Sequence, residues 1–145
     1  MKTNEPAFTI GVEEEYLLVD KKSRALVVDP PETLMSEAEE RCGAELLRSQ
    51  IEIGTKVCNN VQEAREDLAR LRTNIIQVAD SHGLAPIAAS THPFSSWTEQ
   101  KHTEKVRYDQ LTHEMQGAAR RLVICGMHVH VGIGDDELRI DLMNQ

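Results

Sequence analysis

Several features are scarce in this chain of 145 residues, and each scarcity excludes a class of protein. Aromatic residues make up only 3% of the sequence, so aliphatic side chains must fill the core, and stacking on nucleic-acid bases is not expected. Lysine and arginine number 16 against 24 acidic residues, and the resulting net charge of −8 argues against binding to nucleic acid or to an anionic membrane surface. No apolar run approaches the length of a transmembrane helix or of a signal peptide.

Cysteine pairs and nucleotide-binding loops are also missing. The three cysteines are an odd number without a C-x-x-C pair, which favours reduced thiols and a cytoplasmic location. The sequence contains no G-x-G-x-x-G, no G-x-x-x-x-G-K-[ST] and no nucleophile elbow, so any bound ATP would not use a P-loop. With 40% hydrophobic and 28% charged residues, we expect one soluble domain over residues 1–145.

Hydrophobic periodicity and turn residues predict alternating strands and helices. The clearest helix begins at Asn60, which forms a capping box with Glu63, and ends at Gly83. We expect an α+β fold, in which an antiparallel or mixed sheet carries helices on one face. Strands are predicted at 8–20, 25–28, 46–57, 85–90 and 122–133, and helices over about 32–42 (ended by Gly43), from 61, around 106–115 and from 135.

The strand predicted at 122–133 has two different faces, because side chains alternate along a strand. Val123, Cys125, Met127, Val129, Val131 and Ile133 form an apolar face that we assign to the core. His128 and His130 lie on the other face between Gly126 and Gly132, and glycines in a strand often mark the close approach of a ligand. The alternative is a pair of histidines on a solvated face.

Two more predicted strands carry acidic residues opposite an apolar face. In the first, Glu14 joins the apolar side, while Glu13 and Glu15 lie opposite with Gly11. In the other, Gln50, Glu52 and Gly54 lie opposite Ile51 and Ile53. Neighbouring carboxylates repel one another unless a cation such as Mg²⁺ binds between them. The three strands therefore predict one polar surface that holds a divalent cation, although a charge run is often only a solvated face.

Five segments in this order resemble the glutamate–cysteine ligase type 2 family. They are FTIGVEEEYLLVD, LLRSQIEIGTKVC, ASTHPFSSW, RYDQL and CGMHVHVGI, and together they span residues 8–133. The resemblance implies a glutamine-synthetase-like fold and an ATP- and Mg²⁺-dependent ligation of a carboxylate to an amine through an acyl phosphate. Because members of the family are longer, it also implies that the chain is the N-terminal part of the catalytic domain.

The same resemblance implies roles for individual residues, transferred by position. Glu45 matches an acidic position of related ligases only loosely, and a surface ion pair with Glu104 is an alternative role for Arg107. The metal ligands and catalytic residues are Glu13, Glu15, Glu52 and His128; the cofactor contacts are His130 and Gln50; the substrate contacts are His92, Arg107 and Tyr108.

The expected partners are an amino acid or another carboxylate and an amine, with no nucleic acid and no membrane. An incomplete sheet would leave an open edge, so we also expect a homo-oligomer. Two other functions remain open from the residues. A metal-dependent hydrolase would use the His-x-His motif, which suits zinc but lacks an evident third nitrogen or sulfur ligand. A non-catalytic homologue would bind only nucleotide or metal.

Overall fold

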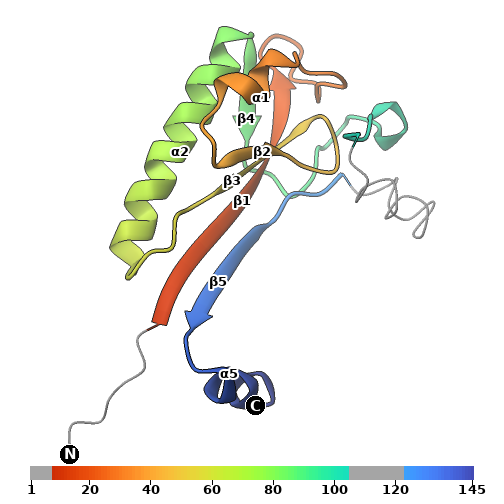
Figure 1. The fold of residues 1–145 in the computed structure, drawn as a ribbon. Helices are drawn as coiled ribbons and strands as arrows, with labels where there is room; N and C mark the ends of the chain where they lie inside the picture. The colour runs from red at the N-terminus through yellow and green to blue at the C-terminus, as the bar shows by residue number, and fades with distance from the viewer. Residues whose placement is uncertain (1–7, 105–122) are drawn as a thin grey trace, which may run out of the picture.

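The structure is a computed structural model that describes residues 8–104 and 123–145 (Figure 1). None of the helices in these two ranges is long and apolar enough to cross a membrane. In chain order the elements are β1 (Phe8–Asp20), α1 (Thr33–Glu37), β2 (Cys42–Ala44), β3 (Gln50–Gly54), α2 (Val61–Ser81), β4 (Leu84–Ile87), the 3-10 helix η1 (Trp97–Glu99), β5 (Met127–Ile133) and α5 (Asp136–Met143).

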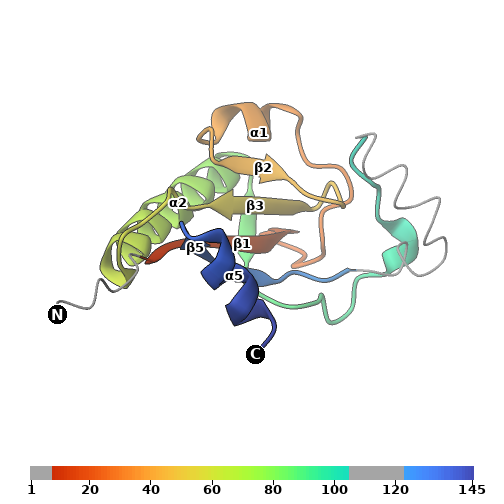
Figure 2. The ribbon, with the colours of Figure 1, turned by 60° about the horizontal axis from the view of Figure 1, so that its bottom comes forward.

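The long strand β1 is the centre of a five-stranded antiparallel sheet (Figures 1 and 2). β3 pairs with one side of β1, and β2 follows β3. The other side of β1 is shared by two strands, since β4 pairs with Leu17–Asp20 and β5 pairs with Phe8–Glu14. The prediction of an α+β fold with an antiparallel sheet is confirmed.

Helix α2 packs on the face of the sheet that we call the back face, which carries Tyr16 and Leu18 of β1. As predicted, Asn60 caps the helix by accepting a hydrogen bond from the Glu63 N–H (2.9 Å). Gly83 follows the helix with a φ of 71°, a left-handed conformation that favours glycine. The main core cluster lies between this helix, α1 and the sheet, and its buried members are Tyr16, Leu18, Leu34, Ile51, Ile53, Leu71, Ile75, Ala79 and Leu84.

Several predicted elements are shorter than expected, among them the strand predicted at 85–90, which is only Leu84–Ile87. The helix predicted over 32–42 ends at Glu37, and Gly43 lies within β2, opposite Glu52, instead of ending a helix. The predicted strand 25–28 is reduced to a single bridge between Leu26 and Val19. The strand predicted over 46–57 is only Gln50–Gly54, because the Gln50 side chain accepts the N–H of Leu47 and closes a turn before it.

The apolar face predicted for the strand at 122–133 is only partly in the core: Val123 is buried in a cluster with Leu17, Leu26 and Leu47, and Cys125 packs against it, but the residues within β5 are not buried. Met127, Val129 and Val131 are 62%, 54% and 59% exposed. Their neighbours on β1 belong to the back face, but α2 packs over β1, β3 and β4 instead of β5. The pairing with β1 begins only at Met127, and the helix predicted around 106–115 lies outside the described residues.

Asp67 of α2 links the helix to the segment around β2. It is 7% exposed and accepts hydrogen bonds from Arg41 (2.7 Å), Arg70 (2.8 Å) and the Lys56 N–H (2.9 Å). Burial alone would raise the pKa of this carboxyl, but the three donors outweigh it and lower the pKa to about 2.

We therefore expect Asp67 to stabilise the fold only while it is ionised. A lowered pKa contributes stability above the ordinary pKa of 3.8, and the contribution disappears as the pH falls toward 2. Asp67→Asn should lower the free energy of unfolding by up to about 2 kcal/mol near neutral pH. Urea unfolding at a series of pH values measures this difference, and a difference that stays constant down to pH 2 would contradict the assignment.

Candidate functional site

The face of the sheet opposite α2, called the front face here, collects the polar residues of three strands. Antiparallel pairing places Glu15 of β1 opposite Glu52 of β3. It places Glu13 opposite His128 of β5, and Gly11 opposite His130. Directly paired residues point to the same side of a sheet. The register therefore brings the four residues expected to ligate metal, Glu13, Glu15, Glu52 and His128, onto one face.

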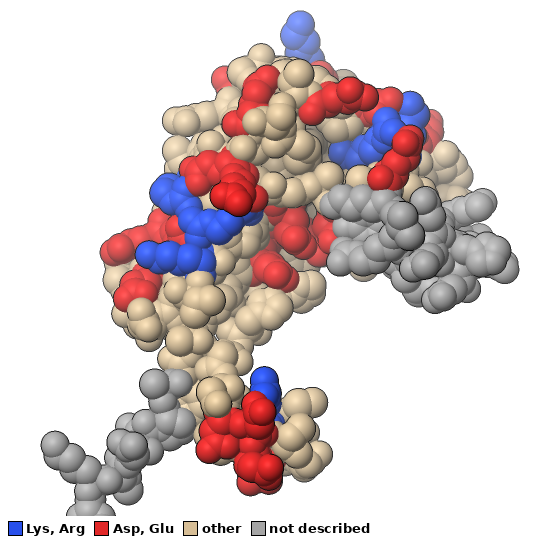
Figure 3. Space-filling model, in the orientation of Figure 1, with Lys and Arg blue, Asp and Glu red and all other residues tan. Residues whose placement is uncertain are grey.

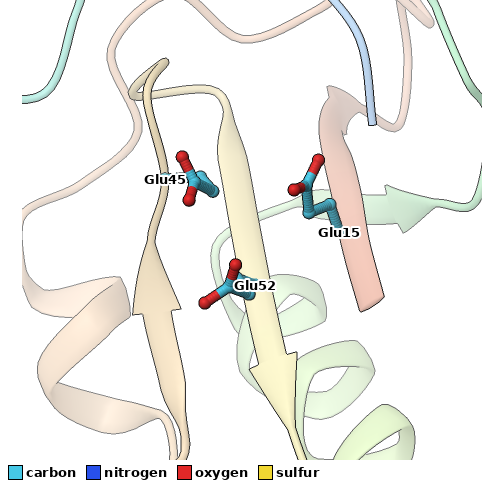
Figure 4. Close-up of side chains that lie close together, drawn as sticks. All are labelled: Glu15, Glu45 and Glu52. Atoms are coloured by element: carbon cyan, nitrogen blue, oxygen red, sulfur yellow. The ribbon is translucent and has the colours of Figure 1, made fainter. Parts of the chain in front are cut away.

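Three carboxylates form an acidic cluster on this face (Figure 4). Glu15, Glu45 and Glu52 each offer an oxygen, and these oxygens lie within 4.8 Å of one another. Glu45 comes directly after β2, where its carbonyl accepts a hydrogen bond from the Thr103 hydroxyl (2.5 Å). Glu15 also accepts the N–H of Gly126 (3.0 Å). The cluster has the oxygen-only donor set that Mg²⁺ prefers.

Glu13 belongs to a second group, one step along β1 from the acidic cluster. Its Oε2 lies 3.0 Å from Nε2 of His130 and 3.6 Å from Nδ1 of His128. The two imidazoles are 59% and 61% exposed, so solvent reaches this end of the front face. The predicted metal ligands are thus divided between an acidic cluster and a mixed group of one carboxylate and two imidazoles.

Glycines lie across from several polar side chains of the front face. Gly43 pairs with Glu52, Gly54 with Glu13, and Gly11 with His130. A methyl group added at Gly43 would meet no atom within 4 Å, and one at Gly54 or Gly11 would meet only ordinary contacts. At these three glycines no side chain projects from the front face beside the polar residues, which leaves space for a ligand.

Gln50 is engaged by the protein itself. It is 3% exposed, and its amide donates to the carbonyl of Ile124 (2.5 Å) while accepting the N–H of Leu47 (3.0 Å). Gln50 thus fixes the segment that leads into β5. These contacts give no support to the predicted role of Gln50 in cofactor binding.

His92 also has its polar atoms occupied. Its Nδ1 accepts the N–H of Ser95 (3.1 Å), so the proton resides on Nε2, which donates to the Arg24 carbonyl (3.0 Å). His92 is buried and stabilises its own loop, and these contacts give no support to a role in substrate binding. The other two predicted substrate contacts, Arg107 and Tyr108, lie outside the described residues.

The middle glutamate of β1 points away from the site and anchors the strand. Glu14 is 6% exposed on the back face and pairs with Arg72 of α2, and it accepts the Tyr16 hydroxyl (2.5 Å). Burial raises the pKa of Glu14, but the bonds from Arg72 and Tyr16 outweigh burial, and the net pKa is lowered. Burial and the adjacent Glu14 raise the pKa of Tyr16 to about 12.

A cavity of about 410 Å³ lies where β4 ends and β5 begins. Glu14, Tyr16 and Arg72 of the back face line it together with Ala88, Ala89 and Met127, and Glu15 is the lining residue that belongs to the acidic cluster. Its volume falls in the range of small-molecule sites. Burial raises the pKa of Cys125, another lining residue, to about 11, so this thiol is protonated near neutral pH and offers no thiolate nucleophile.

Solved structures of ligases share this fold. The glutamate–cysteine ligase of Francisella tularensis in complex with AMP matches with a TM-score of 0.72 and 14% identity, over 97% of this chain and 30% of that one. A bifunctional glutathione synthetase from Pasteurella multocida matches with a TM-score of 0.69 and 13% identity, over 95% and 18%. The described sheet and helices therefore have the fold found within ligases of the glutamate–cysteine class.

Sequence comparison identifies the family within that class. The model of "Glutamate-cysteine ligase family 2 (GCS2)" matches residues 9–145. A "Putative glutamate--cysteine ligase 2" of Rhodospirillum rubrum is 58% identical over 97% of this chain and 38% of its own length. One of Paracoccus denitrificans is 53% identical over 99% and 39%. The chain belongs to glutamate–cysteine ligase family 2, as its motifs predicted, and spans about two fifths of the length of these relatives.

Proposed function

We propose that this chain forms the cation- and nucleotide-binding sheet of an ATP- and Mg²⁺-dependent carboxylate–amine ligase. The observation that carries the proposal is the acidic cluster, in which oxygens of Glu15, Glu45 and Glu52 lie within 4.8 Å of one another. Three carboxylates this close repel one another when all are ionised, and a divalent cation would relieve that repulsion. Family membership supports the choice of a ligase.

The donor chemistry of the front face suits Mg²⁺. Glu15, Glu45 and Glu52 would hold one ion, and Glu13 with His128 would offer ligands to a second on the same face, with His130 beside the nucleotide. When bound, the ions would neutralise the charge that develops on the phosphate oxygens. Because Gly43 and Gly54 carry no side chain, the front face has room for the phosphates at these positions.

The proposed reaction needs no nucleophile from the protein. A substrate carboxylate attacks the γ-phosphoryl group of ATP and releases ADP, and the amine then attacks the resulting acyl phosphate and releases inorganic phosphate. The chain would orient the phosphates, and its fixed carboxylates would hold the cations that neutralise the phosphate charge. This role agrees with the protonated state of Cys125 near neutral pH.

We further propose an amino acid as the carboxylate substrate, and glutamate with cysteine as the pair that the names of the relatives suggest. Arg107 and Tyr108 are kept as proposed substrate contacts, whereas both ring nitrogens of His92 already bond Arg24 and Ser95. Since the relatives are longer, turnover would draw on further strands, a further acidic ligand and basic residues beyond those of this chain. The cytoplasm, where ATP is available, is the proposed location. The hydrolase alternative gains no support from the comparisons.

Addition of MgATP should raise the melting temperature, because a ligand that binds only the folded state stabilises it by mass action. At a MgATP concentration 100 times the dissociation constant, the free energy of unfolding rises by about 2.7 kcal/mol. Glu52→Gln should remove most of the rise, since it deletes one charge of the acidic cluster. Differential scanning fluorimetry measures the shift.

Glu137→Gln provides the matched control, because Glu137 is an exposed glutamate in the first turn of α5 and is not a member of the acidic cluster. ATP with EDTA should give little shift. An equal rise for the wild type and Glu52→Gln would mean that the nucleotide binds elsewhere and would overturn the proposal.

A further inference from the structure

Gln50 lies on the front face, directly beside the acidic cluster. In β3 it comes two residues before Glu52, so both side chains lie on the same face of the sheet. In the register with β1, Gln50 pairs with Leu17, and Glu52 pairs with Glu15. Gln50 is therefore one step along the sheet from the two paired glutamates, between them and the buried Leu17.

The two ends of the Gln50 amide bond backbone groups of two separate segments. Its Oε1 accepts the N–H of Leu47 (3.0 Å), and its Nε2 donates to the carbonyl of Ile124 (2.5 Å). Gln50 is 3% exposed, so the loss of its amide would leave a buried N–H and a buried carbonyl without these partners. One side chain thus connects the turn before β3 to the segment before β5.

The turn before β3 holds the carboxylate of Glu45. The N–H of Leu46 donates to Oε2 of Glu45 (2.5 Å), and the next N–H, that of Leu47, is the one that Gln50 accepts. The backbone N–H of Gln50 also donates to the Leu47 carbonyl (3.0 Å). Gln50 therefore fixes the backbone that follows Glu45, and with it the direction of the Glu45 carboxylate.

The segment before β5 holds the carboxylate of Glu15. The N–H of Gly126 donates to Oε2 of Glu15 (3.0 Å), and the N–H of Glu15 donates to the Gly126 carbonyl (3.0 Å). Gly126 lies two residues after Ile124, whose carbonyl is bonded to Gln50. Movement of this short segment would carry the Gly126 N–H away from the Glu15 carboxylate.

Electrostatic repulsion makes such support necessary. Figure 3 shows acidic side chains in the middle of the visible face, with Lys and Arg farther out. The oxygens of the acidic cluster lie within 4.8 Å of one another, and ionised carboxylates at that separation repel one another. Hydrogen bonds from the backbone keep Glu15 and Glu45 turned toward Glu52 against this repulsion.

We infer that Gln50 is a positioning residue of the cation site: its amide holds Glu15 and Glu45 in the arrangement that binds one divalent cation. The inference rests on the proposed function of the acidic cluster. It gives Gln50 an indirect role, through the backbone at Leu47 and Ile124, in place of the predicted cofactor contact. Residues that orient metal ligands through hydrogen bonds typically contribute about 10–100-fold to metal affinity.

Mn²⁺ titration of the folded Gln50 variants tests the inference. Gln50→Met keeps the length of the side chain but has no N–H and no amide oxygen, so Mn²⁺ binding should weaken about tenfold or more. Gln50→Asn is one methylene too short to reach both partners at once. It should also weaken binding, and it serves as the test if Gln50→Met does not fold.

Asn60→Ala is the matched control. It removes a polar side chain that caps α2, and so it should lower the stability of the fold, but Asn60 is not a member of the acidic cluster. Its Mn²⁺ affinity should equal that of the wild type. A side chain with a merely structural role would behave as Asn60 does, whereas a positioning residue changes the affinity of the folded protein.

Amide hydrogen exchange provides a second readout that needs no metal. In a folded Gln50 variant the N–H of Gly126 should exchange about tenfold faster than in the wild type, because its bond to the Glu15 carboxylate is weakened. Wild-type Mn²⁺ affinity in the Gln50 variants, or unchanged exchange at Gly126, would overturn the inference. A wild type that leaves Mn²⁺ free would instead contradict the proposed function, and exchange at Gly126 would then decide whether Gln50 positions Glu15.

Discussion

Arg72→Ala is expected to lower the free energy of unfolding by about 2–3 kcal/mol. The Arg72 guanidinium is the cationic partner of Glu14, which is 6% exposed on the back face of β1. Without it, the carboxylate remains buried with only the Tyr16 hydroxyl as a donor. Complete loss of a buried partner destabilises by about 3–5 kcal/mol, and the half-exposed position of Arg72 reduces the effect because water can enter.

Urea unfolding at neutral pH measures this effect, and Arg65→Ala is its matched control. Arg65 lies on the same helix, is exposed, and should change stability by less than about 0.5 kcal/mol. The pKa of Glu14 is lowered in the folded state, so the loss should be largest above its ordinary pKa of 4.5 and should shrink below it. An Arg72→Ala protein as stable as Arg65→Ala would contradict the anchoring role.

The sequence predicted the central strand and the long helix correctly because local patterns determine both. Burial alternates in β1 from Val12 to Tyr16, across the run Glu13-Glu14-Glu15, so Glu14 faces α2 and the other two glutamates lie on the front face. The capping box of Asn60 and Glu63 fixes the start of α2 in the same local way. Patterns of this kind need no knowledge of the remaining chain.

The errors concern features that depend on distant residues. Alternation in β5 separates an aliphatic face from the histidines, but it does not say whether a helix covers that face, and here α2 covers other strands. A glycine after a polar stretch is equally typical of a helix end and of a strand position. Gly43 occupies a strand position, opposite Glu52. Burial and pairing are decided by tertiary contacts, which a periodic pattern does not contain.

The candidate site was predictable only in part for the same reason. Glu15 and Glu52 follow from alternation and pairing, whereas Glu45 enters the acidic cluster from the end of β2, a position that pattern alone did not reveal. The pairing of Gly43 and Gly54 with Glu52 and Glu13 also required the register. Alternation already placed Gly11 and Gly54 on the polar faces of their strands, and a search for glycines two residues from each acidic position would also have found Gly43 beside Glu45.

Titration with Mn²⁺, followed by electron paramagnetic resonance, tests most directly the claim that the acidic cluster holds a divalent cation. Mn²⁺ accepts the same oxygen ligands as Mg²⁺ and is observed directly while free in solution. The wild type should bind Mn²⁺ saturably. Glu15→Gln and Glu52→Gln should each weaken binding at least tenfold, because each removes one of three carboxylates that converge within 4.8 Å.

Glu137→Gln should bind as the wild type does, since its carboxylate lies in α5 and outside the cluster. The account therefore predicts one pattern: saturable binding that is lost with Glu15 or Glu52 and kept with Glu137. Saturable binding that survives both cluster substitutions, or a wild-type chain that leaves Mn²⁺ free at millimolar concentration, would contradict it.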